Sequence, residues 1–167
     1  MIESKEGIIK ICNFYISEWH LTMMLLPYIK DNINNNIITT FLEKNIEENV
    51  NILLSKINFK EEIKEKIKKI NWKENRELND INTSNLINSA KNKLIIISGS
   101  MGYVNKINEK LMQKNLKNVK IVNCYKVDKN NKNIKDVLIN HDKILNTSGE
   151  KEISEVFGEH KKSRKAL

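Results

Sequence analysis

The stretch KLIIISGSMGYVNKINEKLMQK, residues 93–114, decides the fold class of this chain. It opens with an aliphatic, β-branched run at residues 93–98, which is too short for a typical helix and is typical of a buried strand. A loop with two glycines and two serines follows, and an amphipathic pattern over residues 102–114 predicts a helix. A strand that leads through a short loop into a helix is one unit of an α/β fold.

The alternation of strand and helix continues on both sides of this stretch. The elements expected before it are a strand at Ile8–Tyr15, a helix that begins after Ser17, a strand at Ile37–Leu42, helices at 46–57 and 60–70, a loop at 72–83 and a short helix at 84–90. Those expected after it are a strand at 119–125, a helix at 134–141, a short extended segment at 143–145 and a last helix at 150–157. Parallel strands need crossover connections, so this order predicts a three-layer αβα sandwich with a mostly parallel central sheet of about five strands.

The length and composition predict one globular domain. The chain has 167 residues, of which 40% are hydrophobic and 30% are charged, and these values exclude collagen-like, disulfide-rich and wholly disordered chains. We expect a single α/β domain over residues 1–158 and a basic, flexible tail over 159–167. The longest apolar stretch, residues 21–29, has about half of the ~20 residues that a membrane-spanning helix needs, and the first residues do not resemble a signal peptide. These features predict a cytoplasmic protein without a membrane partner.

The charge does not by itself predict a nucleic-acid partner. The formal net charge is +8 at pH 7, but the lysines are scattered along the chain, with one dense cluster at residues 160–165. Lys, Asn and Ile are heavily used while Ala, Gly, Pro and Arg are scarce, as in the proteins of an AT-rich genome. Nucleic-acid binding therefore stays an alternative, favoured only by charge, and we expect it to be weak and steeply salt-dependent.

The loop at residues 98–102 is the most suggestive place for chemistry, and two interpretations of it stay open. A strand enters it and a helix leaves it, so its N–H groups can receive an anion. It lacks the lysine of a GxxxxGK[ST] loop and the spacing of GxGxxG, which disfavours ATP hydrolysis. The first interpretation is a nucleotide- or phosphate-binding α/β enzyme that uses this loop. The second is a tight turn in which Ser100 caps the following helix.

The cysteines and histidines predict no catalytic or metal centre. Cys12 and Cys124 both lie in apolar runs, so we expect reduced, buried thiols. His20 and His141 have no second ligand at metal-binding spacing, so we expect no metal. His20 follows the first strand by one helical turn and either caps that helix or lines a site at the strand ends. We predict no cofactor and no enzymatic activity.

Two segments together resemble the MEDS domain, a sensory domain named from methanogens and methylotrophs. The first is GIIKICNFYISEWHLTMMLLPYI, residues 7–29, with a strand that ends in Ile-Cys-x-x-Tyr and a helix with a Leu26-Pro27-Tyr28 step. The second is IVNCYKVDKNNKNIKDVLINHDKIL, residues 121–145, in which Cys124 and Tyr125 end a strand and His141 opens the last short strand. The resemblance covers both ends of the chain.

The resemblance implies a RecA-like α/β fold without a Walker motif, and sensing of a small, possibly hydrocarbon-derived ligand rather than turnover. It implies a signal passed to a partner protein, a regulator or a kinase, or through a homo-oligomer. Because α/β folds bind ligands at the C-terminal edge of the sheet, the expected ligand-binding residues are those that end the strands or follow them. They are Tyr15, Ser17, His20, Ser98, Ser100 and Tyr125. The alternative that the two tyrosines only complete the core stays open.

Overall fold

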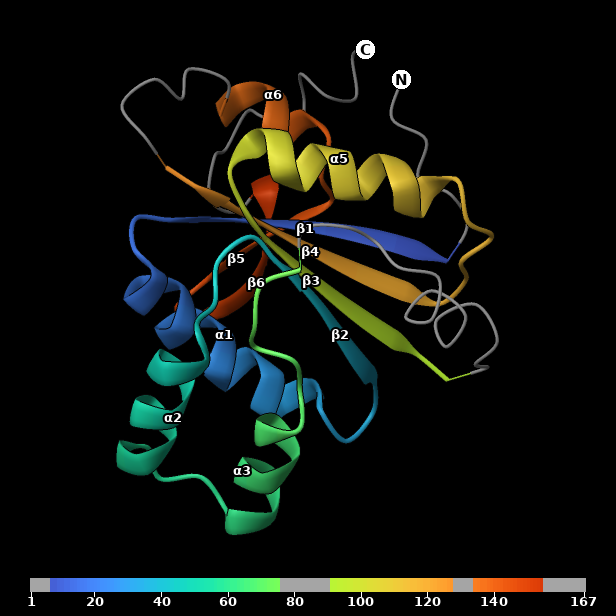
Figure 1. The fold of residues 1–167 in the computed structure, drawn as a ribbon. Helices are drawn as coiled ribbons and strands as arrows, with labels where there is room; N and C mark the ends of the chain where they lie inside the picture. The colour runs from blue at the N-terminus through green and yellow to red at the C-terminus, as the bar shows by residue number, and fades with distance from the viewer. Residues whose placement is uncertain (1–6, 76–90, 128–133, 155–167) are drawn as a thin grey trace.

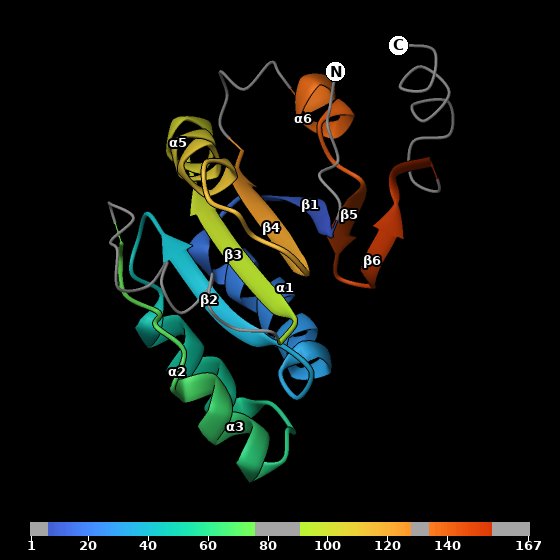
Figure 2. The same cartoon turned by 90° about the vertical axis from the view of Figure 1, so that its right-hand side faces the viewer.

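A computed structural model describes residues 7–75, 91–127 and 134–154, which form one sheet between two layers of helices (Figures 1 and 2). The six strands are β1 (Ile8–Tyr15), β2 (Ile37–Leu42), β3 (Lys93–Gly99), β4 (Val119–Lys126), β5 (Lys143–Asn146) and β6 (Gly149–Glu152). They lie in the order β2-β3-β4-β1-β5-β6, and every pair is parallel except β5 with β6. The predicted α/β fold with a mostly parallel sheet is confirmed, with six strands rather than about five.

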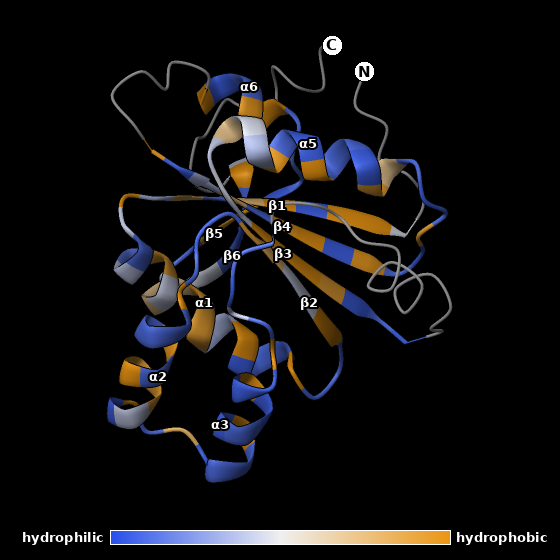
Figure 3. Ribbon diagram, in the orientation of Figure 1, coloured by the Kyte–Doolittle hydropathy of each residue, from blue (hydrophilic) through white to orange (hydrophobic). Residues whose placement is uncertain are grey.

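The helices divide between the two faces of the sheet. They are α1 (Glu18–Asn32), α2 (Glu47–Lys56), α3 (Glu61–Lys68), α5 (Met101–Met112) and α6 (Ile134–Ile139). The first three cover one side, here called the α1 face, and the last two cover the other side, here called the α5 face (Figure 1). Figure 3 shows that the strands are largely hydrophobic, whereas the helices alternate between hydrophobic and hydrophilic residues along their length.

Alternation along each strand decides which side chains reach which face. In β1, Ile11 packs in the cluster with α1, α2 and α3, while its neighbour Cys12 packs in the cluster with α5 and α6. In β4, Val122 and Cys124 belong to the α1 face, while Ile121 and Tyr125 belong to the α5 face. Both faces of the central strands are therefore buried, as expected for parallel strands with helices on both sides.

The end of the chain corrects one prediction. The helix expected at 150–157 is wrong at its start, because residues Gly149–Glu152 form β6 and pair with β5. The turn explains this: the Ser148 N–H donates to Asn146 Oδ1 at 2.8 Å, and Gly149 has φ of +103°, a value that L side chains rarely adopt. The helix expected at 84–90, most of the loop at 72–83 and the tail at 159–167 lie outside the described residues.

The order of the strands places a topological switch at the C-terminal ends of β1 and β4. The two strands are neighbours, but β1 leads into α1 on one face and the chain after β4 next enters α6 on the other (Figure 1). Open α/β sheets generally bind ligands where adjacent connections diverge in this way. Within the described parts of the chain, none of the helices is both long and apolar enough to cross a bilayer.

Candidate functional site

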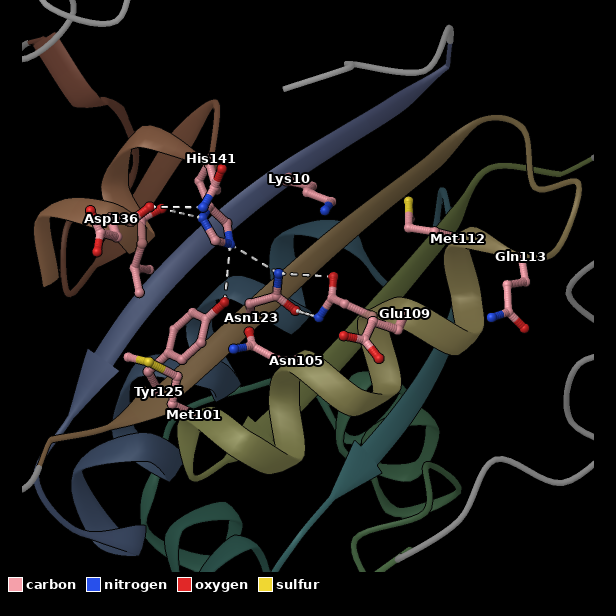
Figure 4. Close-up of a pocket in the computed structure, with 13 residues that line it drawn as sticks. Lys10, Met101, Asn105, Glu109, Met112, Gln113, Asn123, Tyr125, Asp136 and His141 are labelled. Carbon is pink, nitrogen blue, oxygen red and sulfur yellow. Dashed lines mark hydrogen bonds between the residues drawn. The ribbon is translucent and has the colours of Figure 1, made fainter. Parts of the chain in front are cut away.

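A pocket of about 690 Å³ lies on the α5 face, over β1 and β4 and between α5 and α6 (Figure 4). Four elements line it. The strands contribute Lys10 from β1 and Asn123 and Tyr125 from β4. The helix α5 contributes Met101, Asn105, Asn108, Glu109 and Met112, and α6 with the residues after it contributes Asp136, Val137, Asn140 and His141. The pocket therefore joins apolar methionine and valine side chains to a strongly polar inner surface.

The floor of this pocket is a buried chain of polar side chains, here called the polar floor: Asn108, Asn123, His141 and Tyr125 (Figure 4). The Asn108 amide donates to Asn123 Oδ1 at 2.7 Å, and the Asn123 amide donates to Asn108 Oδ1 at 3.3 Å. Asn123 Nδ2 also lies 2.9 Å from His141 Nε2, and the Tyr125 hydroxyl lies 3.5 Å from the same nitrogen. Each of these four side chains is at most 8% exposed, so none can rely on bulk water.

Backbone carbonyls at the two ends fix the direction of every hydrogen bond in the polar floor. The carbonyl of Val104 accepts from Asn108 Nδ2 at 2.9 Å, and the carbonyl of Val137 lies 2.6 Å from His141 Nδ1. A carbonyl oxygen can only accept, so Asn108 Nδ2 and His141 Nδ1 must both carry hydrogen. His141 Nε2 then accepts from Asn123, and its contact to the Tyr125 hydroxyl is long. The Tyr125 hydroxyl is thus the one member of the polar floor with weak internal bonding.

The two cysteines flank this region but do not act together. Cys12 belongs to the α5 face and Cys124 to the α1 face, and both are buried and unpaired, as predicted. Burial raises the pKa of Cys12 to about 12 and also raises the pKa of Cys124. Both thiols therefore stay protonated at neutral pH, and neither is activated as a nucleophile.

The six predicted ligand-binding residues do not form one group. Tyr15 and Tyr125 both end their strands, but Tyr15 lies on the α1 face and Tyr125 lines the pocket on the α5 face. Ser98 is buried beside Tyr15, where burial raises the pKa of the Tyr15 phenol and a hydrogen bond with Ser98 opposes that shift. Of the six, Tyr125 alone lines the pocket between α5 and α6.

Ser17 and His20 form the N-terminal cap of α1. Ser17 Oγ accepts from the His20 N–H at 3.1 Å, and His20 Nδ1 accepts from the Ile16 N–H at 3.1 Å. The His20 N–H in the first turn of α1 and the Ile16 N–H just before the helix are thereby satisfied. The helix begins after Ser17 as predicted, with Ser17 as its N-cap, and His20 contributes to the cap, one of the two roles that the sequence left open.

The loop at residues 98–102 already holds a carboxylate from its own chain. Glu43, which follows β2, accepts from the Ser100 N–H at 2.8 Å and from the Ser100 hydroxyl at 3.3 Å. Gly99 makes this approach possible, because a Cβ there would lie 2.7 Å from Glu43 Cβ. Ser100 also accepts from the Tyr103 N–H and caps α5, as predicted. A phosphate group at this helix start would have to displace Glu43.

The sequence analysis missed every residue that lines the pocket except Tyr125, and two of the missed residues carry a signal in the sequence. Asn123 interrupts the apolar run of β4, and Asn108 lies on the apolar stripe of α5 between Val104 and Leu111. A side-chain amide at a buried strand or helix position needs a polar partner. Each of these two asparagines therefore indicates that a polar side chain such as the other lies beside it. Lys10 carries no such signal, because a lysine within a strand is also compatible with an exposed edge.

The described residues show no cluster of three or more His, Cys, Asp or Glu side chains that would hold a metal ion. The polar floor offers one imidazole and two carboxamides, and the imidazole nitrogens are both engaged. Comparisons of the chain with protein-family models, with curated proteins and with solved structures found no match. The resemblance to the MEDS domain therefore stays a prediction.

Proposed function

We propose that this chain is a non-catalytic cytoplasmic sensory module that binds a small organic molecule in the pocket between α5 and α6. The observation that carries the proposal is the polar floor. Buried amides and imidazoles cost free energy relative to apolar side chains unless they are fully hydrogen-bonded, and a sheet face under two helices needs none of them for folding. A pocket with an apolar wall and a few convergent polar groups is the usual form of a small-molecule site.

Binding fits this site better than catalysis. General acid–base work needs a side chain with a free proton acceptor or donor aimed at the substrate. His141 uses Nδ1 to donate to the Val137 carbonyl and Nε2 to accept from Asn123. The thiol on the same face of the sheet, Cys12, is held in its protonated form by burial. His141 and Cys12 can therefore contribute to the shape and hydrogen bonding of the site, but neither is poised to attack a ligand.

The position of the pocket suggests how a bound ligand would act on a partner. Its walls are α5 and α6, and α6 is a short helix of six residues that packs through Val137 and Leu138. A ligand that contacts both helices would bind one position of α6 relative to α5 more tightly than another. It would thereby shift α6 toward the position that it binds more tightly. We propose that a partner protein, or a second copy of the chain, contacts this outer surface of α5 and α6.

A thermal-shift screen tests the proposal. Nucleotides, apolar acids, alcohols and short DNA are added to the purified protein, and a ligand at 100 times its dissociation constant adds about 2.7 kcal/mol of apparent stability. We expect small organic molecules to stabilise the protein, while nucleotides and DNA do not. Stabilisation by nucleotides that Glu43→Gln alters would instead favour the phosphate-binding enzyme.

Two conservative variants locate the binding of any hit. Tyr125→Phe removes the hydroxyl with weak internal bonding, so we expect it to reduce affinity by about 2–10-fold, the equivalent of one hydrogen bond. Tyr15→Phe is the matched control, because it removes the same group from the opposite face of the sheet. Equal loss of affinity in both variants, or stabilisation by none of the small molecules, would contradict the proposal.

A further inference from the structure

We infer that the ligand of this pocket is a small organic acid whose carboxylate is bound by the ammonium group of Lys10. The inference rests on the proposed function and adds the chemical class of the ligand. Lys10 is half-buried, lines the pocket and lies on the other side of Asn123 from Tyr125 (Figure 4). A positive charge that is partly removed from water is costly unless an anion lies beside it.

The neighbouring carboxylate, Asp142, hydrogen-bonds to the main chain of Lys10, and its charge also acts on the Lys10 ammonium group. The carboxylate of Asp142 accepts from the Lys10 backbone N–H at 2.9 Å, and the Asp142 N–H donates to the Lys10 carbonyl at 2.8 Å. Among the described residues, no hydrogen bond or ion pair of the Lys10 ammonium is found. Burial lowers the pKa of Lys10, and the charge of Asp142 offsets this only in part. The strand contact thus holds Asp142 while the ammonium faces the pocket.

The remaining polar groups of the pocket do not supply a second anion for Lys10. The side-chain oxygens of Asn108 and Asn123 already accept from each other's amides. The two carboxylates of the lining, Glu109 and Asp136, are exposed at the rim, and Figure 4 shows both well apart from Lys10. Water and salt screen such rim charges far more than a half-buried ammonium. Lys10 therefore gives the inner part of the pocket a positive character.

The rest of the lining suits the body of an organic acid. Met101 and Met112 are partly exposed to the pocket from α5, and their flexible thioethers adapt to ligands of different shape. The Tyr125 hydroxyl offers a second donor on the far side of Asn123 from Lys10 (Figure 4). A carboxylate at Lys10 with an alkyl or aromatic body along the methionines uses each of these features, whereas an alcohol or hydrocarbon leaves the ammonium unpaired.

The test compares acids with their neutral amides. Hexanoate and benzoate, and hexanamide and benzamide, are titrated into ¹⁵N-labelled protein at pH 7, with the chemical shifts of backbone and side-chain amides followed by NMR. We expect each carboxylate to bind at least about tenfold tighter than its amide, the effect of one charge-assisted hydrogen bond. Shifts should concentrate on Asn105, Asn123 and Tyr125.

Three variants make the outcome decisive. Lys10→Met keeps the side-chain length and should abolish the preference for carboxylates, whereas Lys10→Arg should retain it. Lys106→Met is the control, since it removes the same charge from an exposed position of α5 outside the pocket. If acids and amides bind equally in a manner sensitive to Tyr125→Phe, the inference fails while the proposed function stands. If neither kind of probe shifts the pocket signals, both fail.

Discussion

On the α1 face three helices cover the sheet and close an apolar core, whereas on the α5 face two helices cover it and the pocket with the polar floor lies between them. Leu25 and Ile29 of α1 are fully buried against the first face, together with Val50 of α2 and Ile67 of α3. The α5 face has an equally buried apolar part, which includes Val104, Ile107 and Leu111 of α5. Asn108 of the same helix, however, belongs to the polar floor.

Polar side chains occur on both faces, and their partners explain the difference. On the α1 face, Asn13 Nδ2 donates to the Leu145 carbonyl at 2.9 Å, and the Thr40 hydroxyl donates to the Asn71 carbonyl. Such bonds attach a strand to a neighbouring segment of backbone. On the α5 face, Asn108, Asn123 and His141 bond chiefly to one another and border a pocket. The first arrangement stabilises the fold, and the second shapes a surface that a ligand can contact.

The largest expected effect is on the apolar core of the α1 face. Leu25→Ala should lower the free energy of unfolding by about 2–5 kcal/mol, because the three helices around it cannot collapse into the cavity. The matched variant Leu111→Ala on the α5 face should cost less, near the lower end of that range, because the structure around the pocket can relax. Urea denaturation measures both. An equal or greater cost for Leu111→Ala would show that the two faces are packed alike.

Two glycines flank the turn from β3 to α5, and they should respond to alanine substitution in opposite directions. Gly99 has φ of +152° and lies against Glu43, so Gly99→Ala adds both backbone strain and overlap. We expect a loss of about 2–4 kcal/mol in the free energy of unfolding. Gly102 is the control: a Cβ there meets nothing within 4 Å and the residue is in α5. Gly102→Ala should stabilise the protein by about 0.4–1 kcal/mol.

The polar floor should cost stability when it is broken. Asn123→Ala leaves the Asn108 amide and His141 Nε2 without their partner, for a loss of about 1–3 kcal/mol in unfolding experiments. Asn108→Ala and the double variant complete a cycle whose coupling energy should be about 0.5–3 kcal/mol. A coupling energy near zero would mean that the two amides do not depend on each other, and the distinction between the faces would weaken.

Much of the fold follows from the sequence because each signal is local. The run Ile8–Tyr15 and the run at 93–98 are short, apolar and β-branched, and both form strands at the predicted places. The caps at Ser17 and Ser100 were also predictable, since a serine before a helical pattern binds an N–H a few residues later. The region after Asn146 was not, because a four-residue strand such as β6 forms through pairing with β5 rather than through its own pattern.

The candidate site was less predictable because it depends on which face each strand residue reaches. Tyr15 and Tyr125 follow similar strand patterns, yet the register pairs Tyr15 with Lys126 and places the two phenols on opposite faces. A shift of one residue would have put them on the same face. The pairing of Glu43 with the loop at 98–102 joins residues 57 positions apart, which no local pattern reports.

The smallest expected effect lies at the edge of the α1 face, where Glu150 of β6 contacts α1, β4 and β5. Its carboxylate accepts from the Tyr28 hydroxyl at 2.7 Å and pairs with Lys120 at 3.2 Å and Lys143 at 3.4 Å. Burial raises the pKa of Glu150, but the hydrogen bonds and the two ammonium groups outweigh it and hold that pKa below its ordinary value. A carboxyl with a lowered pKa in the folded state favours folding when it is charged.

The contribution of Glu150 should therefore be present above the ordinary carboxyl pKa and disappear as the pH falls through the lower folded value. Glu150→Gln should reduce the free energy of unfolding by about 0.2–1 kcal/mol at neutral pH, the range for partly exposed ion pairs. The difference from the unsubstituted protein should shrink as the pH falls below about 4, where the carboxyl takes up a proton first in the unfolded state and then, at lower pH, in the folded state. Urea denaturation at about pH 7, 5 and 3 measures this change. A difference that stays constant over that range would mean that Glu150 contributes through packing and not through its charge.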